Sequence, residues 1–195
     1  MYEITNEIES ALKTTPKQRW ENNRDAIATL NELSSSGRTP TPDELNKLAL
    51  FNGWGAIPTI FDLNPTGWSK QAQLELQVLL GQEKYALAAE SILNAHYTDC
   101  LIVRAIWDKL KSIGFNGGRI LEPSCGTGFF FGCMPKEIQN NSQLFGVELD
   151  KTAAAMASYL YPKSTIYDRG FETVEFPDGY FDWERRATVS SGKNK

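Results

Sequence analysis

The chain has 195 residues, of which 41% are hydrophobic and 23% charged, so it can bury one well-packed core and has the composition of a globular protein. Its net charge of -4 argues against a surface that binds nucleic acid over its whole extent, because such surfaces are basic. Three cysteines and one histidine are too few for a closed zinc site, and no apolar run approaches the ~20 residues that a membrane span requires, so we expect neither a metal nor a membrane.

Residues 1–94 are predicted to be helical, because apolar residues recur three or four positions apart. A stretch rich in serine, glycine and proline interrupts this pattern before Thr41, which is followed by a proline and two acids and therefore predicts a capped helix start. The expected helices lie at about residues 4–12, 27–33, 42–51, 70–80 and 84–95, with a loop rich in glycine, proline and aromatics at 51–68. The helix at 70–80 carries leucines on more than one side, so we expect it to be buried against its neighbours.

From residue 95 the pattern changes to alternating strands and helices. A helix is expected at 99–113, with an inward face formed by Leu101, Ile102, Ala105, Ile106 and Leu110. Strands are expected at 119–122, 144–149 and 164–167, with the start of a fourth at 180–183, and a helix at 151–161. This order predicts an α/β fold with a mainly parallel sheet, right-handed crossovers and a ligand at the carboxyl ends of the strands. The expected divisions are a helical region at 1–94, an α/β domain at 95–183 and a disordered tail at 184–195.

A glycine loop follows the first predicted strand in 118-GRILEPSCGTGFFFG-132. Gly126 and Gly128 allow a tight turn and close approach of a ligand. The third glycine of the dinucleotide pattern G-x-G-x-x-G comes one place late, at Gly132. The segment also lacks the lysine followed by Ser or Thr that a phosphate-binding loop requires. It therefore suits adenosine with a methionine tail better than a phosphate. Glu148, about 20 residues further on at the end of the second strand, can accept hydrogen bonds from both ribose hydroxyls. The alternative is a structural turn followed by a surface acid.

Three motifs carry a resemblance to a known family. The segments 122-EPSCGTGFF-130 and 145-FGVELD-150 resemble the S-adenosylmethionine loop and the ribose-binding motif of DNA adenine methyltransferases, and 96-HYTD-99 resembles the motif that closes over the methionine end. The surroundings, 47-KLALFNGWGAIPTIFD-62 and 95-AHYTDCLIVRAIWDKL-110, look like the start of large bacterial or phage proteins that join an adenine methylase-like domain to a helicase. The resemblance covers about residues 43–182. It implies a partial, Rossmann-like class I methyltransferase fold, S-adenosylmethionine as cofactor and DNA as partner.

The resemblance also implies a role for each matching residue. The cofactor-binding set would be Tyr97 and Thr98 on the methionine side, Glu122, Pro123, Cys125, Gly126 and Gly128 in the loop, Phe129 at the loop exit and Glu148 on the ribose. Asp168 would replace an acid that the family places two residues later, before Phe171. Tyr97 has an alternative as a core aromatic, and His96 is expected to be a hydrogen-bonded neighbour. Cys125 is expected to be a small loop residue and not a nucleophile, since no base pairs with it.

The family's catalytic tetrapeptide, Asn/Asp-Pro-Pro-aromatic, has no counterpart where it is expected. After 180-YFD-182 the sequence reads 183-WERRATVSSGKNK-195, which looks like a truncation or an altered reading frame. The Asn64-Pro65 pair in 62-DLNPTGW-68 is read as an ordinary proline turn, because Thr66-Gly67 displace the aromatic. We therefore predict no catalytic residue.

The resulting interpretation is the cofactor-binding part of a DNA adenine methyltransferase that is catalytically incomplete. One alternative is an accessory subunit whose unfinished sheet edge pairs with a partner chain that supplies the missing strands. Another is a methyltransferase for small molecules or proteins. The odd number of cysteines and the lack of a signal peptide at Met1 predict reduced thiols in the cytoplasm.

Overall fold

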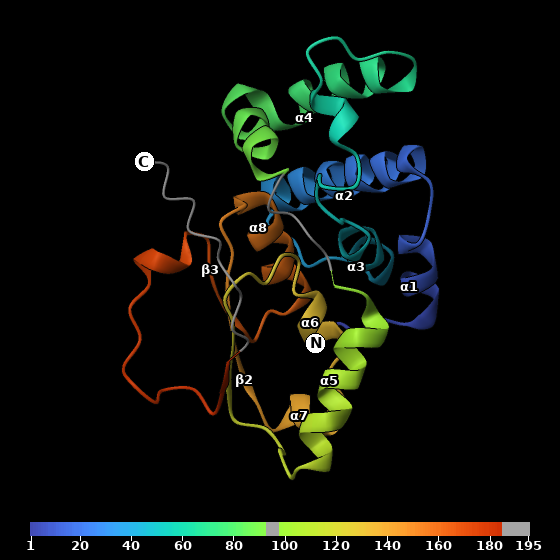
Figure 1. The fold of residues 1–195 in the computed structure, drawn as a ribbon. Helices are drawn as coiled ribbons and strands as arrows, with labels where there is room; N and C mark the ends of the chain where they lie inside the picture. Colours follow the sequence, from blue (N-terminus) through green and yellow to red (C-terminus); the bar gives the residue numbers. More distant parts are fainter. Residues whose placement is uncertain (93–97, 185–195) are drawn as a thin grey trace, which may run out of the picture.

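A computed structural model of the protein describes residues 1–92 and 98–184 (Figure 1). The helices are α1 (Asn6–Leu12), α2 (Pro16–Ser36), α3 (Pro42–Ala49), α4 (Trp68–Ser91), α5 (Cys100–Ser112), α6 (Phe129–Gly132), α7 (Lys136–Asn140) and α8 (Lys151–Leu160). Short 3-10 turns, η1 and η2, lie at Pro58–Phe61 and Phe171–Thr173. The strands are β1 (Arg119–Glu122), β2 (Gln143–Val147), β3 (Thr165–Tyr167) and β4 (Trp183–Glu184).

The four strands form one parallel sheet in the order β3-β2-β1-β4. This is the order in which a doubly wound α/β sheet begins, so the predicted fold class is confirmed. The fourth strand starts at Trp183, later than the expected Tyr180. Its entry is held by Asp182, whose carboxylate accepts from the Arg119 N–H at 2.8 Å while its own N–H donates to the Arg119 carbonyl at 2.9 Å.

One face of the sheet is covered by α5, α6 and α8. Ile120 of β1 lies in register with Leu144 of β2 and Trp183 of β4, so the three side chains share this face. Trp183 stacks on Phe130 with ring centroids 5.2 Å apart, and Trp107 of α5 contacts both rings. The Trp107 Nε1–H also donates to the Phe130 carbonyl at 3.0 Å. The phenylalanine run after the glycine loop therefore contributes to the core.

The opposite face carries an aromatic cluster from the segment between β3 and β4. Phe145 of β2 contacts the rings of Tyr180 and Phe181 at 5.8 and 5.3 Å, and Phe176 contacts Phe181 at 4.8 Å. The Arg119 guanidinium lies over the Tyr180 ring, 4.4 Å from its centroid. Aromatic edge-to-face contacts hold this segment against the sheet.

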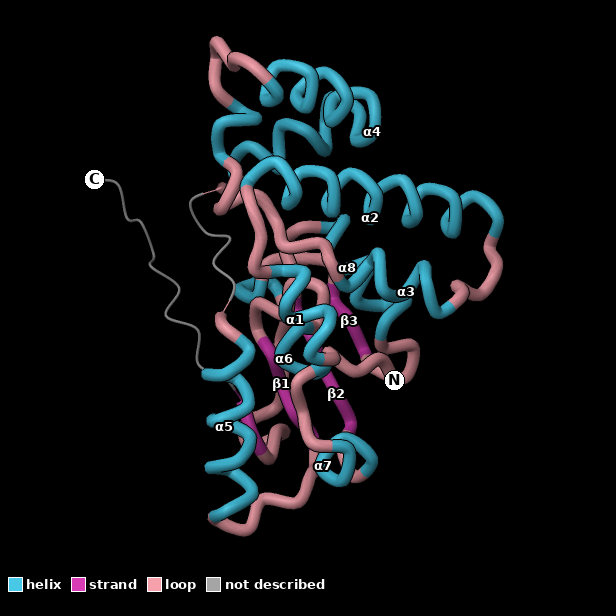
Figure 2. Tube along the Cα trace, turned by 90° about the vertical axis from the view of Figure 1, so that its right-hand side faces the viewer, coloured by secondary structure: helices cyan, strands magenta, loops and turns pink. Residues whose placement is uncertain are grey.

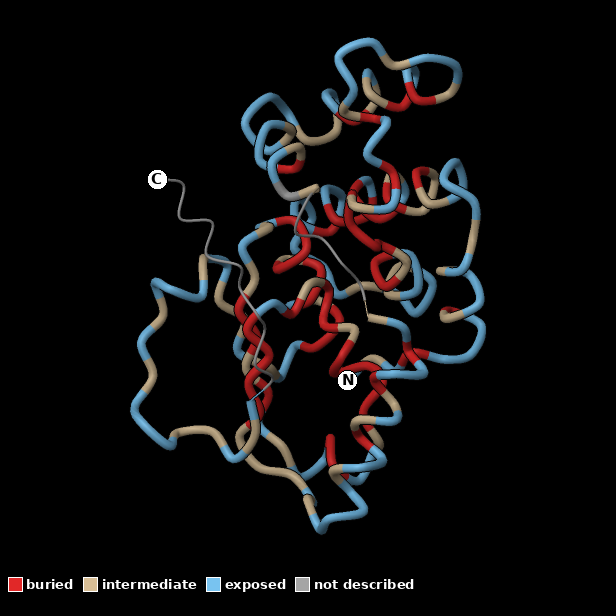
Figure 3. Tube along the Cα trace, viewed as in Figure 1, coloured by how far each residue is buried: buried red, intermediate tan, exposed pale blue. Residues whose placement is uncertain are grey.

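Of the N-terminal helices, α2 and α4 lie beyond the carboxyl ends of the strands, whereas α1 lies beside α5. Figure 2 shows α7, which leads into β2, at one end of the sheet, and α2 and α4 beyond the other end. Residues 2–4 run against the α/β part, because the Tyr2 N–H donates to the Leu160 carbonyl and the Ile4 N–H to the Gly132 carbonyl. Buried residues of both regions form one continuous hydrophobic core (Figure 3). The expected domain boundary at residue 94 and residues 185–195 of the expected tail lie outside the described residues, so both remain predictions. Glu184, the first residue of that expected tail, is instead the last residue of β4.

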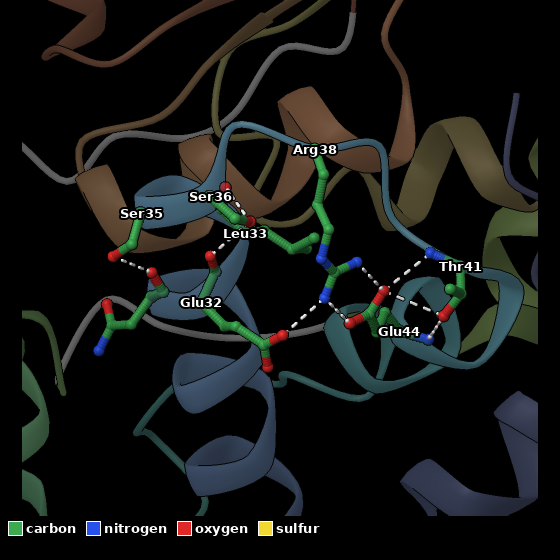
Figure 4. Close-up of polar contacts among 8 residues, drawn as sticks. Glu32, Leu33, Ser35, Ser36, Arg38, Thr41 and Glu44 are labelled. Atoms are coloured by element: carbon green, nitrogen blue, oxygen red, sulfur yellow. Dashed lines mark hydrogen bonds and ion pairs between the residues drawn. The ribbon is translucent and has the colours of Figure 1, made fainter.

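A charged network fixes the turn between α2 and α3 (Figure 4). Gly37, at φ 64°, ends α2, and the Arg38 guanidinium binds the carboxylates of Glu32 and Glu44. Thr41 and Glu44 form a reciprocal capping box, so the predicted helix start is confirmed. Hydrogen bonds from Arg38 and then from the Thr41 backbone lower the pKa of Glu44 to about 2.

The two helices expected between residues 70 and 95 form one element, α4, with a kink at Gly81 (φ 73°, ψ 169°). The first half is not buried as expected. Leu76 is fully buried, but Leu74 is 52% and Val78 84% exposed. Among the described elements, α2 and η1 make the main contacts with α4, and these contacts leave Leu74 and Val78 exposed.

The inward face predicted for α5 is wrong for three of its five residues, whereas Ile106 and Leu110 pack against the core. Leu101 and Ile102 are 65% and 55% exposed, Ala105 is also exposed, and Ile106 and Leu110 are half-buried. The buried side consists of Cys100, Val103 and Trp107. The helix has apolar residues on two sides. The side that carries Trp107 faces the sheet, because this ring packs against Phe130 and Trp183.

None of the described helices combines the length and apolarity needed to cross a membrane. Within the same described residues, His, Cys, Asp and Glu side chains form no group of three or more that could hold a metal ion.

Candidate functional site

Three strand ends meet at the carboxyl edge of the sheet. The glycine loop follows β1, Glu148 follows β2 and Asp168 follows β3. The Cys125 N–H donates to the Val147 carbonyl at 3.0 Å, and the Glu148 N–H donates to the Tyr167 carbonyl at 2.9 Å. The loop and the two strand ends are therefore joined by backbone hydrogen bonds at the place where parallel sheets bind ligands.

The loop makes a tight turn in which two glycines are in the left-handed region. Gly126 has φ 53° and Gly128 has φ 81°, and the Gly128 N–H donates to the Cys125 carbonyl at 2.7 Å. A side chain on Gly128 would collide with the ring of Tyr161, which lies just after α8. The missing side chain at this position thus makes room for packing beneath the loop, a reason that the local sequence pattern does not reveal.

Glu148 contacts the loop directly. Its Oε2 accepts from the Gly126 N–H and its Oε1 from the Asp150 N–H, each at 2.8 Å. Burial raises the pKa of Glu148, and the N–H groups of Asp150 and Gly126 oppose part of that shift. The Leu149 N–H also interacts with this carboxylate, so backbone donors from three residues fix its orientation.

The loop residues nearest the strand are buried. Glu122 is 1% and Cys125 4% exposed, and Pro123 is also buried. The Cys125 Sγ lies over Gly146, where an added Cβ would be 2.7 Å away. Burial, followed by the negative charges of Glu148 and Glu122, raises the pKa of Cys125 well above its usual value. These residues shape the loop from beneath, and the Cys125 thiol is unsuited to nucleophilic attack at neutral pH.

The remaining predicted residues lie around this centre. Phe129 is half-buried at the start of α6, and Asp168 is exposed directly after β3. Thr98 is half-buried next to Asp99, which caps α5 by accepting from the Leu101 N–H at 2.8 Å. Tyr97 and His96 lie outside the described residues, so their predicted roles remain untested. Asn64 and Pro65 lie in the bend that precedes α4, exposed and half-buried respectively.

Two residues at this edge had not been singled out from the sequence. Asp150 donates its N–H to Glu148 and caps α8 with its carboxylate, which accepts from the Thr152 N–H at 2.8 Å. Burial raises the pKa of Asp150, hydrogen bonds from Thr152 and Ala153 oppose the shift, and the positive charge of Lys84 in α4 opposes it to a smaller extent. An acid directly before a helical pattern could have identified the cap. No local signal identifies Lys84, because α4 reaches the site only through the tertiary fold.

No protein-family model matches the chain, and no curated protein matches it significantly. One solved structure is similar to it, a protein from Listeria monocytogenes assigned as a class I S-adenosylmethionine-dependent methyltransferase. The identity is 16% and the TM-score 0.42, over 89% of this chain and 57% of that chain. The chain therefore spans little more than half the length of that protein. A likeness of this size is too loose to transfer a function, so the function has to be inferred from the residues at the carboxyl edge.

Proposed function

We propose that the chain is the S-adenosylmethionine-binding part of a class I DNA adenine methyltransferase. The observation that supports this most is the contact between Glu148 and Gly126. It places a half-buried carboxylate beside a tight glycine turn, at the edge where ligands bind in parallel sheets. In this proposal Glu148 binds the ribose hydroxyls, and the backbone of Gly126 and Gly128 lies against the nucleoside.

The local charge favours this cofactor over one that carries phosphates. Side chains at the edge are acidic, in particular Glu148, Asp150 and Asp168, and they would repel a pyrophosphate. The helix after the loop is α6, which has only four residues and directs Phe130 and Phe131 into the core, so it provides a poor anion site. S-adenosylmethionine carries a positive sulfonium and a positive amino group and no phosphate. When bound, it would supply an electrophilic methyl group.

The molecule that accepts the methyl group is proposed from the motif resemblance alone. In that reading the methyl group goes to the exocyclic amine of adenine in DNA, and the chain binds the cofactor without completing the transfer. The family's Asn/Asp-Pro-Pro-aromatic motif would stand at the position of Trp183 and Glu184, which carry neither the amide nor the prolines.

A second candidate function is that of an accessory subunit completed by a partner chain. The outer face of α5 forms a shallow apolar hollow lined by Leu101, Ile102, Ala105, Ile106, Lys109 and Leu110. This hollow lies on the β4 side of the sheet, since Trp107 of the same helix contacts Trp183. Among the described strands β4 pairs only with β1, so an added strand could pair with β4 and bury the face of α5.

Calorimetric titration with S-adenosylmethionine tests the leading proposal. Glu148→Ala should weaken binding about 10- to 100-fold, because it removes charge-assisted hydrogen bonds to the ligand. Asp168→Asn changes an exposed side chain that makes no hydrogen bond within the described residues, so it should fold normally and weaken binding less. Glu175→Ala, on the exposed segment before β4, is the matched control and should bind like the native chain.

If a folded sample of the native chain does not bind S-adenosylmethionine at millimolar concentration, the proposal is refuted.

A methyl-transfer assay with tritiated cofactor and unmethylated DNA then separates the two candidate functions. The chain alone should give no incorporation. Incorporation that appears only after addition of a partner chain would favour the accessory subunit, and incorporation by the chain alone would contradict both.

A further inference from the structure

Two cysteines from different elements face each other in the core. Cys100 is the first residue of α5, and Cys133 follows the last residue of α6. Their Sγ atoms are 2.8 Å apart, although the residues are separated by 33 positions in the sequence. Both thiols are free, and the residues are only 1% and 7% exposed. The third cysteine, Cys125, packs separately over Gly146.

A surface hollow lies beside the pair. Cys133 borders a surface hollow of about 450 Å³ between residues 3–6, α5 and residues 132–136. Arg104 crosses this region, donating to the Ile4 carbonyl at 3.0 Å and to Asn6 at 3.2 Å. A molecule the size of water or hydrogen peroxide can enter this hollow beside Cys133, which is the more exposed of the two cysteines.

The electrostatic environment keeps both groups as thiols under ordinary conditions. Burial raises the pKa of Cys133 and of Cys100, while the positive charge of Arg104 lowers both to a smaller extent. The thiolate is the reactive form, so attack on an oxidant is slow at neutral pH and occurs where a small oxidant can enter. A buried pair of this kind is therefore stable in a reducing cytoplasm and is protected from large disulfide reagents.

We propose that Cys100 and Cys133 form a dithiol site that hydrogen peroxide converts into an intramolecular disulfide. The Cys133 sulfur, after losing its proton to water in the hollow, attacks one peroxide oxygen. The S–O bond forms, the O–O bond breaks, and the departing hydroxide takes up a proton to become water. The Cys100 sulfur then displaces the hydroxyl from the Cys133 sulfenic acid and releases its own proton, which gives the disulfide and a second water. The two thiols together lose two electrons, and peroxide gains them.

The disulfide would fasten two segments that flank the proposed cofactor site. Thr98 and Asp99 directly precede Cys100, and the glycine loop lies one α6 helix before Cys133. A covalent link between these segments restricts the unfolded chain, which stabilises the folded protein without new noncovalent contacts. The Cys100–Cys133 disulfide is thus a reversible crosslink, which peroxide forms and thiols reduce.

Peroxide treatment of the native chain, followed by intact-mass and peptide analysis, tests this directly. We expect a product that lacks two hydrogens, a Cys100–Cys133 crosslinked peptide, and a melting temperature about 5–10 °C higher that returns to its starting value with dithiothreitol. The variant C125S should behave in the same way. C100S and C133S should show no intramolecular crosslink and no rise in melting temperature.

The peptide map of the native chain identifies the crosslinked cysteines directly, so the test does not depend on the folding of a serine variant. The alanine variants C100A and C133A provide a second pair of controls. The proposal is overturned if peroxide yields only sulfinic acid at Cys133, if the crosslink involves Cys125 or joins two chains, or if the crosslinked product melts at or below the temperature of the reduced protein.

Discussion

Tyr161 offers a sharp test of how the glycine loop is supported. The residue follows α8, is fully buried and packs its ring edge-to-face against Phe131 at 5.7 Å. Its hydroxyl makes no hydrogen bond to any of the described residues. A buried, unpaired hydroxyl costs about 1–3 kcal/mol, so Tyr161→Phe should stabilise the protein by about 1 kcal/mol or more.

Gly132 completes a double-mutant cycle with this position. An added Cβ on Gly132 would lie 2.5 Å from the Tyr161 hydroxyl and 2.6 Å from the Ile4 Cγ1. Overpacking of this kind costs about 1–3 kcal/mol, so Gly132→Ala should destabilise the protein. In the Tyr161→Phe background the oxygen is gone and only Ile4 obstructs the methyl group. The cost of Gly132→Ala should then fall by about 1 kcal/mol, which is the coupling expected for side chains in contact.

Urea unfolding followed by circular dichroism measures all four members of the cycle. Tyr159→Phe, which changes a half-buried tyrosine of the same helix, is the control and should alter stability by less than about 0.5 kcal/mol. A loss of stability in Tyr161→Phe would show that the hydroxyl has a partner. Additive effects in the double variant would show that Gly132 and Tyr161 do not contact each other as described.

Three further predictions concern the supporting fold. Arg38 lowers the pKa of Glu44 to about 2, so ionised Glu44 stabilises the native state at any pH above its unfolded pKa. The difference in the free energy of unfolding between the native chain and Glu44→Ala should therefore disappear as the pH falls from about 5 to 2. A difference that stays constant in urea unfolding over this range would contradict the prediction. On α5, Ile102→Glu should leave the melting temperature nearly unchanged, whereas Val103→Ala should cost ~2 kcal/mol, and the reverse order would restore the face predicted from the sequence. At the α4 kink, Gly81→Ala should cost about 1–3 kcal/mol in urea unfolding, and a stabilising effect would mean that α4 runs straight.

The sequence predicted the features that depend on neighbouring residues. The first strand was placed at its observed bounds, Arg119–Glu122, because a short apolar run meets a proline and then the glycine turn. The place of Glu148 at the end of the second strand was predicted from its separation of about 20 residues from the loop, but its contact with the Gly126 N–H was not. The helix start at Thr41 was also predictable, since its capping box lies within four residues.

Features that depend on distant residues could not be predicted in this way. The periodicity of α5 is compatible with two apolar faces, and only the fit of Trp107 against Phe130 and Trp183 decides between them. The room that Gly128 makes for Tyr161 and the meeting of Cys100 with Cys133 have no local signature, because the partners are 33 residues apart in each case. The charge of Lys84 in α4 acts on Asp150 although the two residues are 66 positions apart in the sequence.

The anchoring of the first residues sets an order of events during synthesis. Tyr2 and Ile4 form their backbone hydrogen bonds with Leu160 and Gly132, so these bonds cannot form until the ribosome has made and released almost the whole α/β part. At translation rates of about 5–20 residues per second, the segment waits roughly 8–30 s for its partners. During that time the apolar side chain of Ile4 is available to chaperones, and docking of this segment becomes a late, long-range step that completes the fold.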